Sequence, residues 1–358
     1  MMIMKILILL AILGIFSGIF AFYRGRFLEK VDSIDTPLVS VIIPARNEEN
    51  NLKKILTSLK NCTYPNLEVI VVDDNSTDRT FEVAQSFGAK VVRIIERENG
   101  FLGKPYACLK GFKNSQGDIL IFVDADVEFE SNAIKSIVSE VLRTKGVVSV
   151  WPKHIVKKPY ENLSMIFAII SAMASKSFTI IENTKPIGIY GPLIAVSREN
   201  YIKVGTHYVV KNEVVEDFKL GQAFLKANIP ITNFLGSDLV KFRMYPEGFN
   251  SLFKGWSKNS ALGSAIVDFS IVLPIMLFLF GSLIPPLYYR IYPFFYLYFA
   301  YVFLIYIFAR RVGEFSVIAS IFYPAVVFFT LYVISYSFYA TFIRGFVEWK
   351  DVKIFTRR

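Results

Sequence analysis

Two pairs of aspartates stand about fifty residues apart, each directly after an apolar run. Asp73 and Asp74 follow one run, and Asp124 and Asp126 follow the other. Short runs rich in Val and Ile that end in polar residues are typical of buried parallel strands. Ligands bind at the carboxyl ends of such strands. Carboxylates at i and i+2 can converge on one hard divalent cation that also binds phosphate oxygens. The pattern indicates an enzyme for a metal-bound diphosphate, most simply a nucleotide-sugar.

The segments around these pairs alternate between strand and helix patterns. We expect strands over residues 38–43, 67–72, 90–94, 119–123 and 147–151, helices from 51, over 79–87, 103–114 and 132–142, a strand pair within 188–197, and an amphipathic helix from about 212 to 227. This alternation predicts an α/β domain with a mostly parallel sheet covered by helices on both faces. No Gly-x-Gly-x-x-Gly fingerprint and no Walker motif is present, so neither a dinucleotide cofactor nor a P-loop is indicated.

The composition is too apolar for an ordinary soluble enzyme, with 53% hydrophobic residues and a mean hydropathy of +0.44. The excess lies in segments long enough to be membrane spans, at residues 2–22, 266–289, 291–308 and 315–343. We therefore predict an N-terminal transmembrane anchor (1–34), a catalytic domain (35–264) and a C-terminal membrane region (265–358). The apolar segment 163–177 is expected to form a helix at the membrane surface or along an acceptor groove.

Basic residues favour one orientation of this membrane protein. Arg24, Arg26 and Lys30 follow the first apolar segment, which predicts a cytoplasmic domain in a multi-pass cell-membrane protein. A cleaved signal peptide is an alternative, because small residues lie near the end of that segment. The net charge of +10 lies largely beside apolar spans, where it fits lipid headgroups rather than nucleic acid. Two cysteines, Cys62 and Cys108, fit a reducing compartment.

The C-terminal segments leave a conflict in the topology. Three spans after a cytoplasmic domain would place the C-terminus outside, yet the basic tail of residues 350–358 favours the inside. One segment is then re-entrant or interfacial. We take the proline-interrupted segment 266–289 as the best candidate.

Five motifs in the middle of the chain carry a family resemblance. They are VIIPARNEE (41–49), VVDDNSTD (71–78), GKPYA (103–107), DAD (124–126) and ED (216–217). Together they resemble the family-2 inverting glycosyltransferases of the GT-A fold. Two further motifs, FRMY (242–245) and GWSKN (255–259), with the apolar tail, resemble membrane-bound enzymes that glycosylate isoprenoid lipids, such as those acting on carotenoid acids or associated with hopanoids.

The resemblance implies a role for each motif. Asp124 and Asp126 would hold Mg²⁺ or Mn²⁺ on the donor diphosphate, which stabilises the leaving group. Asp217 would be the general base for the acceptor, a role worth about 10²–10⁴-fold in rate, with Glu216 as its neighbour. The nucleotide-sugar would also contact Pro44, Ala45, Arg46, Glu48, Asp73, Asp74 and Lys104, with Asp74 bonded to the base.

One departure concerns a Gln-x-x-Arg-Trp motif found in processive relatives. The matching positions for Gln and Arg hold Leu252 and Gly255, and only Trp256 is kept. Trp256 could stack on the acceptor or the sugar. The diphosphate would take its cationic partner from Arg243, Lys254 or Lys258 instead.

The sequence therefore predicts metal-dependent, inverting transfer of a hexose, with UDP-glucose as donor, to an isoprenoid or carotenoid-like membrane lipid. A polyprenyl-phosphate sugar transferase and a polysaccharide synthase are alternatives with the same chemistry. A membrane scaffold with an inactive GT-A domain is the alternative outside enzymes. The same residues also have purely structural explanations. Asp124 and Asp126 could be ordinary turn residues, and Glu216 and Asp217 could be acids that stabilise the start of a helix. The sugar, the acceptor and the oligomeric state are not identified by the sequence.

Overall fold

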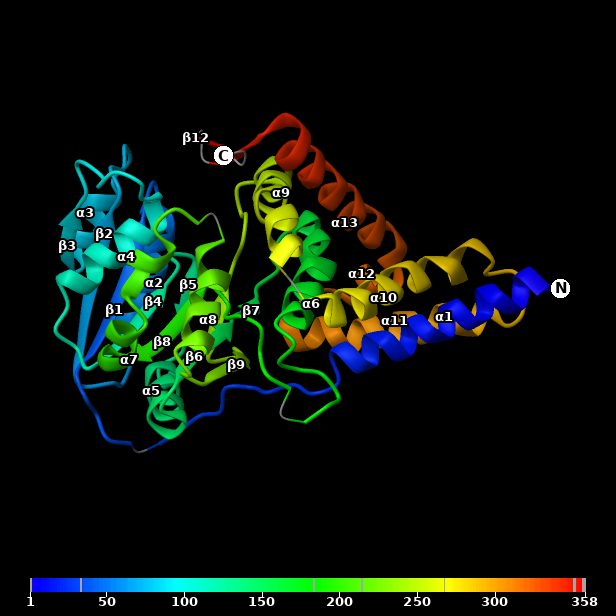
Figure 1. Cartoon of the computed structure of the whole chain (residues 1–358), viewed down its shortest axis with the longest axis horizontal. Coiled ribbons are helices and arrows are strands. Elements are labelled where there is room, and N and C mark those ends of the chain that lie inside the picture. Colours follow the sequence, from blue (N-terminus) through cyan, green and yellow to red (C-terminus); the bar gives the residue numbers. More distant parts are fainter. Residues whose placement is uncertain are drawn as a thin grey trace. The chain divides into compact units, whose positions relative to one another are not determined.

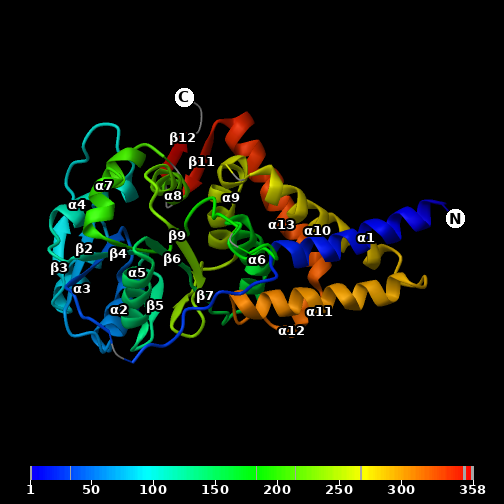
Figure 2. The same ribbon diagram turned by 60° about the horizontal axis from the view of Figure 1, so that its bottom comes forward.

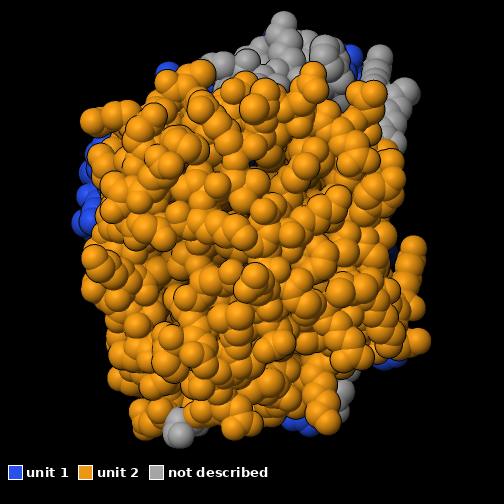
Figure 3. Space-filling view, turned by 90° about the vertical axis from the view of Figure 1, so that its left-hand side faces the viewer, with its two compact units in different colours: residues 1–25, 154–185, 243–358 blue, residues 26–153, 186–242 orange. Residues whose placement is uncertain are grey.

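The computed structural model describes residues 2–32, 34–182, 184–213, 215–266, 268–349 and 352–355 (Figure 1). They form two compact units, coloured separately in Figure 3. The sheet unit comprises Arg26–Lys153 and Pro186–Phe242, and the helical unit comprises Met1–Gly25, His154–Lys185 and Arg243–Arg358. The domain limits predicted at residues 34 and 264 stay a prediction, since the two compact units are divided at other positions of the chain.

The sheet unit is built on a seven-stranded sheet with the order β3-β2-β1-β4-β8-β6-β9. The strands are β1 (Val39–Ala45), β2 (Leu67–Asp73), β3 (Lys90–Arg93), β4 (Ile119–Val123), β6 (Val147–Trp151), β8 (Leu193–Ser197) and β9 (Ile231–Leu235). Strand β8 is antiparallel to both of its neighbours, and the other pairings are parallel. The prediction of a mostly parallel sheet is confirmed.

Helices and short strands complete this unit. They are α2 (Glu49–Lys60), α3 (Thr80–Ser86), α4 (Gly103–Lys113), α5 (Ala133–Thr144), α7 (Arg198–Lys203), η2 (Thr206–Val210), α8 (Glu216–Lys226), β5 (Val127–Phe129), β7 (Lys153–His154, at the limit between the units) and β10 (Val240–Phe242). Helices α4 and α8 bury side chains such as Ala107, Leu220 and Phe224 against Ile42 and Leu120 of the sheet. This packing fixes the starts of both helices beside the carboxyl ends of β1 and β4.

The strand pair predicted within 188–197 is wrong. Only β8 forms there, and residues 186–192 run to it as irregular chain. Pro192 has no backbone N–H for a ladder. A Cβ added to Gly188 would lie 2.6 Å from the ring of Phe218, so this stretch packs closely on α8 rather than pairing as a strand.

The helical unit contains α1 (Met2–Ala21), η1 (Pro159–Ser164), α6 (Met165–Ala174), α9 (Phe249–Ile266), α10 (Phe269–Leu287), α11 (Phe294–Val312), α12 (Val317–Ile321), α13 (Tyr323–Phe338), η3 (Tyr339–Arg344), β11 (Phe346–Trp349) and β12 (Val352–Phe355). Within the described residues, four segments are long and apolar enough to cross a membrane: Met2–Ala21, Phe269–Leu287, Phe294–Val312 and Tyr323–Arg344. Most of α6 is buried, so this helix lies inside the unit.

Candidate active site

Five of the residues singled out in the sequence meet at one cavity in the sheet unit. The lining comprises Pro44, Lys104, Cys108, Phe122, Val123, Asp124, Gly191, Ile194, His207, Glu216 and Asp217. These residues come from the ends of β1 and β4, the start of α4, the segment before β8, η2 and the first turn of α8. The carboxyl edge of the sheet is therefore where the predicted chemistry converges, as the strand pattern implied.

A lysine bridges the acidic residues of this cavity. The Nζ atom of Lys104 lies 2.8 Å from Oδ1 of Asp124 and 3.3 Å from Oε1 of Glu216. Burial by itself lowers the pKa of Lys104, but the charges of Asp124, Glu216 and Asp217 outweigh it and hold that pKa well above its usual value. The ammonium group is thus charged, and it is the protein's own counter-ion for the cluster.

The carboxylate of Asp217 is held in one position by its neighbours. Its Oδ1 accepts a hydrogen bond of 2.7 Å from the backbone N–H of Phe218. Its Oδ2 lies only 2.0 Å from the place where a Cβ on Gly191 would stand, so the carboxylate rests directly on that glycine. Burial, followed by the charge of Glu216, raises the pKa of Asp217 to about 6. A carboxyl group with this pKa can exchange a proton near neutral pH.

The two aspartates after β4 crowd negative charge at the same edge. The backbone N–H of Asp124 donates to Pro192 O at 3.0 Å, which fixes the turn against the segment before β8. Burial, then the charges of Asp124 and Glu48, raise the pKa of Asp126. A divalent cation would offset this crowding. Among the described residues no group of three His, Cys, Asp or Glu side chains could hold a metal, so phosphate oxygens and water would have to complete the shell. With phosphate oxygens and water as the remaining ligands, the carboxylates of Asp124 and Asp126 fit Mg²⁺ or Mn²⁺.

The loops after β1 and β2 are tied to each other. The backbone N–H of Asp74 donates to Ala45 O at 2.8 Å, and the N–H of Glu48 donates to Oγ1 of Thr80 at 2.8 Å. Arg46 lies between these anchors and is half-buried. The loop after β1, which is predicted to contact the nucleotide-sugar, therefore has a defined backbone.

The adjacent aspartates of the second loop differ in their contacts. Asp73 is fully buried, and its Oδ1 accepts the backbone N–H of Ser76 at 3.1 Å. This bond makes Asp73 a brace of its own loop. Asp74 faces Arg97, with Oδ1 to Nε at 3.2 Å, and its Oδ2 lies 2.7 Å from the place of a Cβ on Gly103. Asp74 is thus packed against the start of α4, one residue from Lys104.

Four residues predicted to contact the donor belong to the helical unit instead. Arg243 pairs with the fully buried Glu161, Nη2 to Oε1 at 2.6 Å. Trp256 is buried, stacks on Phe167 with centroids 4.5 Å apart, and its indole N–H donates to another buried side chain, Ser164 Oγ, at 2.9 Å. Lys258 is half-buried in α9, and Lys254 is exposed. The contacts of these residues with the donor stay a prediction.

Sequence reasoning missed residues that complete the cavity. Gly191, Cys108 and His207 line it without belonging to any motif used for prediction. His207 is buried and its ring Nδ1 lies 2.6 Å from the hydroxyl of Tyr201, while burial lowers its pKa to about 3. A neutral histidine of this kind supports the cavity wall. The one sequence signal for Gly191 is its place before a proline, which marks an irregular turn.

Comparison with known proteins agrees with this geometry. The family model described as Glycosyl transferase family 2 matches residues 40–205. A 4,4'-diaponeurosporenoate glycosyltransferase of Staphylococcus aureus (strain USA300) is 32% identical over 361 residues, covering 97% of this chain and 96% of its own. This chain belongs to glycosyl transferase family 2. A second relative of that name, from Staphylococcus haemolyticus (strain JCSC1435), is 37% identical over 281 residues, covering 76% of this chain and 74% of its own.

Among solved structures, the family 2 chain resembles a mannosyltransferase from Pyrobaculum calidifontis in complex with GDP-Man and Mn²⁺. The two share a TM-score of 0.56 and 16% identity over 94% of this chain and 96% of that one. This likeness concerns the fold alone, and it confirms the GT-A fold expected from the motifs. Membership of family 2 also confirms the prediction of a glycosyltransferase.

Proposed function

We propose that this family 2 glycosyltransferase transfers a hexose from a nucleotide-sugar, UDP-glucose, to an isoprenoid lipid of the carotenoid-acid type, with inversion. The observation that carries the proposal is the cavity in which Lys104, Asp124, Glu216 and Asp217 converge at the carboxyl edge of the sheet. The names of the two staphylococcal relatives, which cover most of the chain, support the acceptor class.

The donor would bind across the loops after β1 and β2, with Asp74 facing the base. Asp124 and Asp126 would hold Mg²⁺ or Mn²⁺, which supplies charge stabilisation for the departing diphosphate. The mannosyltransferase from Pyrobaculum calidifontis, solved with both GDP-Man and Mn²⁺, supports such a use of metal. Lys104 would add positive charge beside Asp124, from which its Nζ lies 2.8 Å away.

Asp217 would face the acceptor oxygen, opposite the leaving group. From a hydroxyl acceptor it would remove a proton as the sugar is transferred. A carboxylate acceptor, which a diaponeurosporenoate would supply, is already ionised near neutral pH and needs no base. Asp217 would then orient the acceptor. In both cases one displacement inverts the anomeric centre.

The membrane would deliver the acceptor. A long apolar lipid stays in the bilayer, and the four apolar segments would keep the enzyme beside it. We propose that the sheet unit faces the cytoplasm, because Arg24, Arg26 and Lys30 follow α1 directly.

The test is a transfer assay with membranes that contain the protein, labelled UDP-glucose and a carotenoid acid. The proposal expects a glucosylated carotenoid, identified by mass spectrometry. Polyprenyl phosphate replaces the carotenoid acid in a parallel assay. Product from that lipid alone would contradict the acceptor class and favour a polyprenyl-phosphate sugar transferase.

A further inference from the structure

Three of the four apolar segments form one bundle in the helical unit. Helices α1, α10 and α11 lie side by side in both ribbon views (Figures 1 and 2). The hydroxyl of Tyr301 on α11 donates to Ala11 O on α1 at 2.8 Å. A Cβ on Gly14 would lie 3.0 Å from the Cα of Gly281, so α1 and α10 are in backbone contact. Small residues permit this close packing of helices in membranes.

One end of this bundle, here called the inner end, is marked by the last residues of α1 and α11 and the first of α10. Arg311 Nη1 donates to the carbonyl oxygens of Phe22 and Tyr23 at 2.6 and 3.0 Å. Lys176 Nζ donates to Oγ of Ser270, at the start of α10, at 2.7 Å. The carbonyl oxygen of Phe178, two residues after Lys176, accepts from the backbone N–H of Arg24, just after α1, at 3.0 Å. The chain therefore crosses the bundle three times and is back at the inner end after α11.

The next segment, residues 313–345, begins at the inner end and turns back into the bundle. The N–H of Ser316 donates to Oδ1 of Asn162 in η1 at 2.9 Å. A few residues later, Tyr298 donates to Ile321 O at 2.5 Å and Tyr323 donates to Ser282 O at 2.9 Å. Tyr298 and Ser282 stand about 20 Å from the inner end, at 1.5 Å per residue. Against a bilayer core of about 30 Å, α12 therefore enters about halfway or somewhat further.

Helix α13 then returns to the place from which the segment started. Ser337, in its last turn, donates to the carbonyl oxygen of Ser257 in α9. The neighbouring Trp256 donates to Ser164 at the end of η1. Both ends of the segment are thus tied to η1, one through Asn162 and one through α9.

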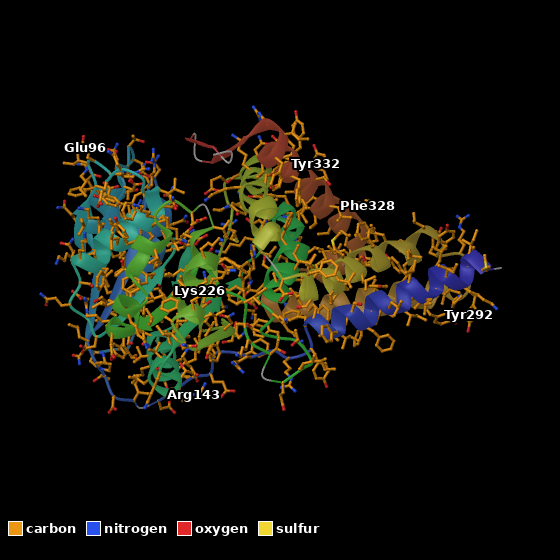
Figure 4. The ribbon with its side chains drawn as sticks, viewed as in Figure 1. Glu96, Arg143, Lys226, Tyr292, Phe328 and Tyr332 are labelled. Atoms are coloured by element: carbon orange, nitrogen blue, oxygen red, sulfur yellow. The ribbon has the colours of Figure 1, made fainter. Side chains whose placement is uncertain are left out.

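We propose that residues 313–345 form a re-entrant hairpin, α12 entering and α13 leaving on the inner side, that contacts bilayer lipid without reaching the outer surface. Phe322, Phe328 and Tyr332 keep 64%, 55% and 62% of their surface exposed on this hairpin. Figure 4 shows Phe328 and Tyr332 pointing away from the neighbouring helices. Large apolar side chains on this face match the acyl chains of the bilayer.

This assignment resolves the charge conflict in the sequence. The hairpin then ends on the inner side, where Arg310 and Arg311 also lie, and this is the side that the charges of the following sequence favour. The segment predicted to be re-entrant, 266–289, contains α10, which is one continuous helix in spite of its prolines. The re-entrant element is the last apolar segment instead. This inference does not depend on the enzymatic activity.

Cysteine labelling of cells that express the full chain tests the proposal. Tyr292→Cys lies between α10 and α11 at the outer end, and Phe342→Cys lies in η3, after α13 at the C-terminal end of the hairpin; both positions are exposed. A membrane-impermeant thiol reagent is applied before and after permeabilisation. The parent chain, with Cys62 and Cys108 in the sheet unit, is the matched control for background.

We expect Tyr292→Cys to be labelled in intact cells and Phe342→Cys only after permeabilisation. Labelling of both in intact cells would mean that α13 crosses the membrane, and would overturn the proposal. Labelling of neither would mean that α10 is re-entrant, and would overturn it equally. The reverse pattern would keep the hairpin and refute the cytoplasmic orientation of the proposed function.

Discussion

Replacing Gly191 with alanine tests whether the position of the Asp217 carboxylate matters for catalysis. The added Cβ would lie 2.0 Å from Oδ2, 2.9 Å from Cγ and 3.2 Å from Cβ of Asp217, where 3.4 Å is an ordinary contact. The carboxylate must therefore move by about 1.4 Å. A small rotation does not relieve this, because Oδ1 is held by the backbone N–H of Phe218.

A displacement of about 1 Å at a reacting group costs about 10²-fold in rate. We expect Gly191→Ala to lower kcat by about that factor, which corresponds to about 2.7 kcal/mol of transition-state stabilisation. The KM for the donor should change little, since Asp217 is proposed to face the acceptor. Initial rates in membranes at saturating acceptor measure both constants.

Gly103→Ala is the matched control, because its Cβ would meet Oδ2 of Asp74 at 2.7 Å. That variant should raise the donor KM and leave kcat nearly unchanged. In an Asp217→Asn background, Gly191→Ala should add little further loss. If Gly191→Ala keeps kcat within threefold of the parent, or if its effect adds fully to that of Asp217→Asn, the reasoning is refuted.

Three further predictions concern Lys104, Asp217 and Arg243. Lys104→Met removes the ammonium group that neutralises the acidic cluster, so we expect tighter binding of Mn²⁺ in the absence of nucleotide and a rate of transfer at least tenfold lower. Electron paramagnetic resonance measures the Mn²⁺ affinity, and weaker binding would contradict the prediction. With a hydroxyl acceptor the rate should fall as pH drops below about 6, because Asp217 becomes protonated, and Glu216→Gln should move that limb to lower pH; a carboxylate acceptor should show no such limb from Asp217. Arg243→Met leaves the buried carboxylate of Glu161 without its cationic partner, with the backbone N–H groups of Lys157 and Lys158 still bonded to it, so it should destabilise the protein by about 3–5 kcal/mol in thermal unfolding. Adding Glu161→Gln should recover most of that loss. An unchanged unfolding temperature with a raised donor KM would instead support the predicted diphosphate contact of Arg243.

The strands and acidic motifs of the sheet unit were predictable because their signals are local. The runs 67–72 and 119–123 are apolar throughout and end in aspartates, and β2 and β4 lie there. Their place in one sheet follows from the alternation of strands and helices. Asp124 was therefore expected at the carboxyl edge, whereas Asp217 was expected at the site only from the family resemblance; the structure places both at one cavity.

Contacts between distant residues could not be predicted from the same signals. The support of Asp217 by Gly191 joins two segments that have no shared periodicity, and a lone glycine has many uses in a chain. The pairing of Glu161 with Arg243 joins segments 82 residues apart and removes from solvent a cation that the sequence assigned to the donor. The apolar character of 315–343 was evident, but a helix that crosses and a hairpin that returns bury similar side chains.

Metal-dependent transfer to lipid tests the central claim most directly. Membranes containing the protein are given labelled UDP-glucose and a carotenoid acid, with Mn²⁺ or with EDTA, beside the variant Asp126→Asn. The account predicts label in the organic phase with Mn²⁺, and almost none with EDTA or in the variant. Transfer that continues in EDTA and in Asp126→Asn would contradict the role given to the two aspartates after β4. Absence of transfer from every nucleotide-sugar tried would contradict the proposed function.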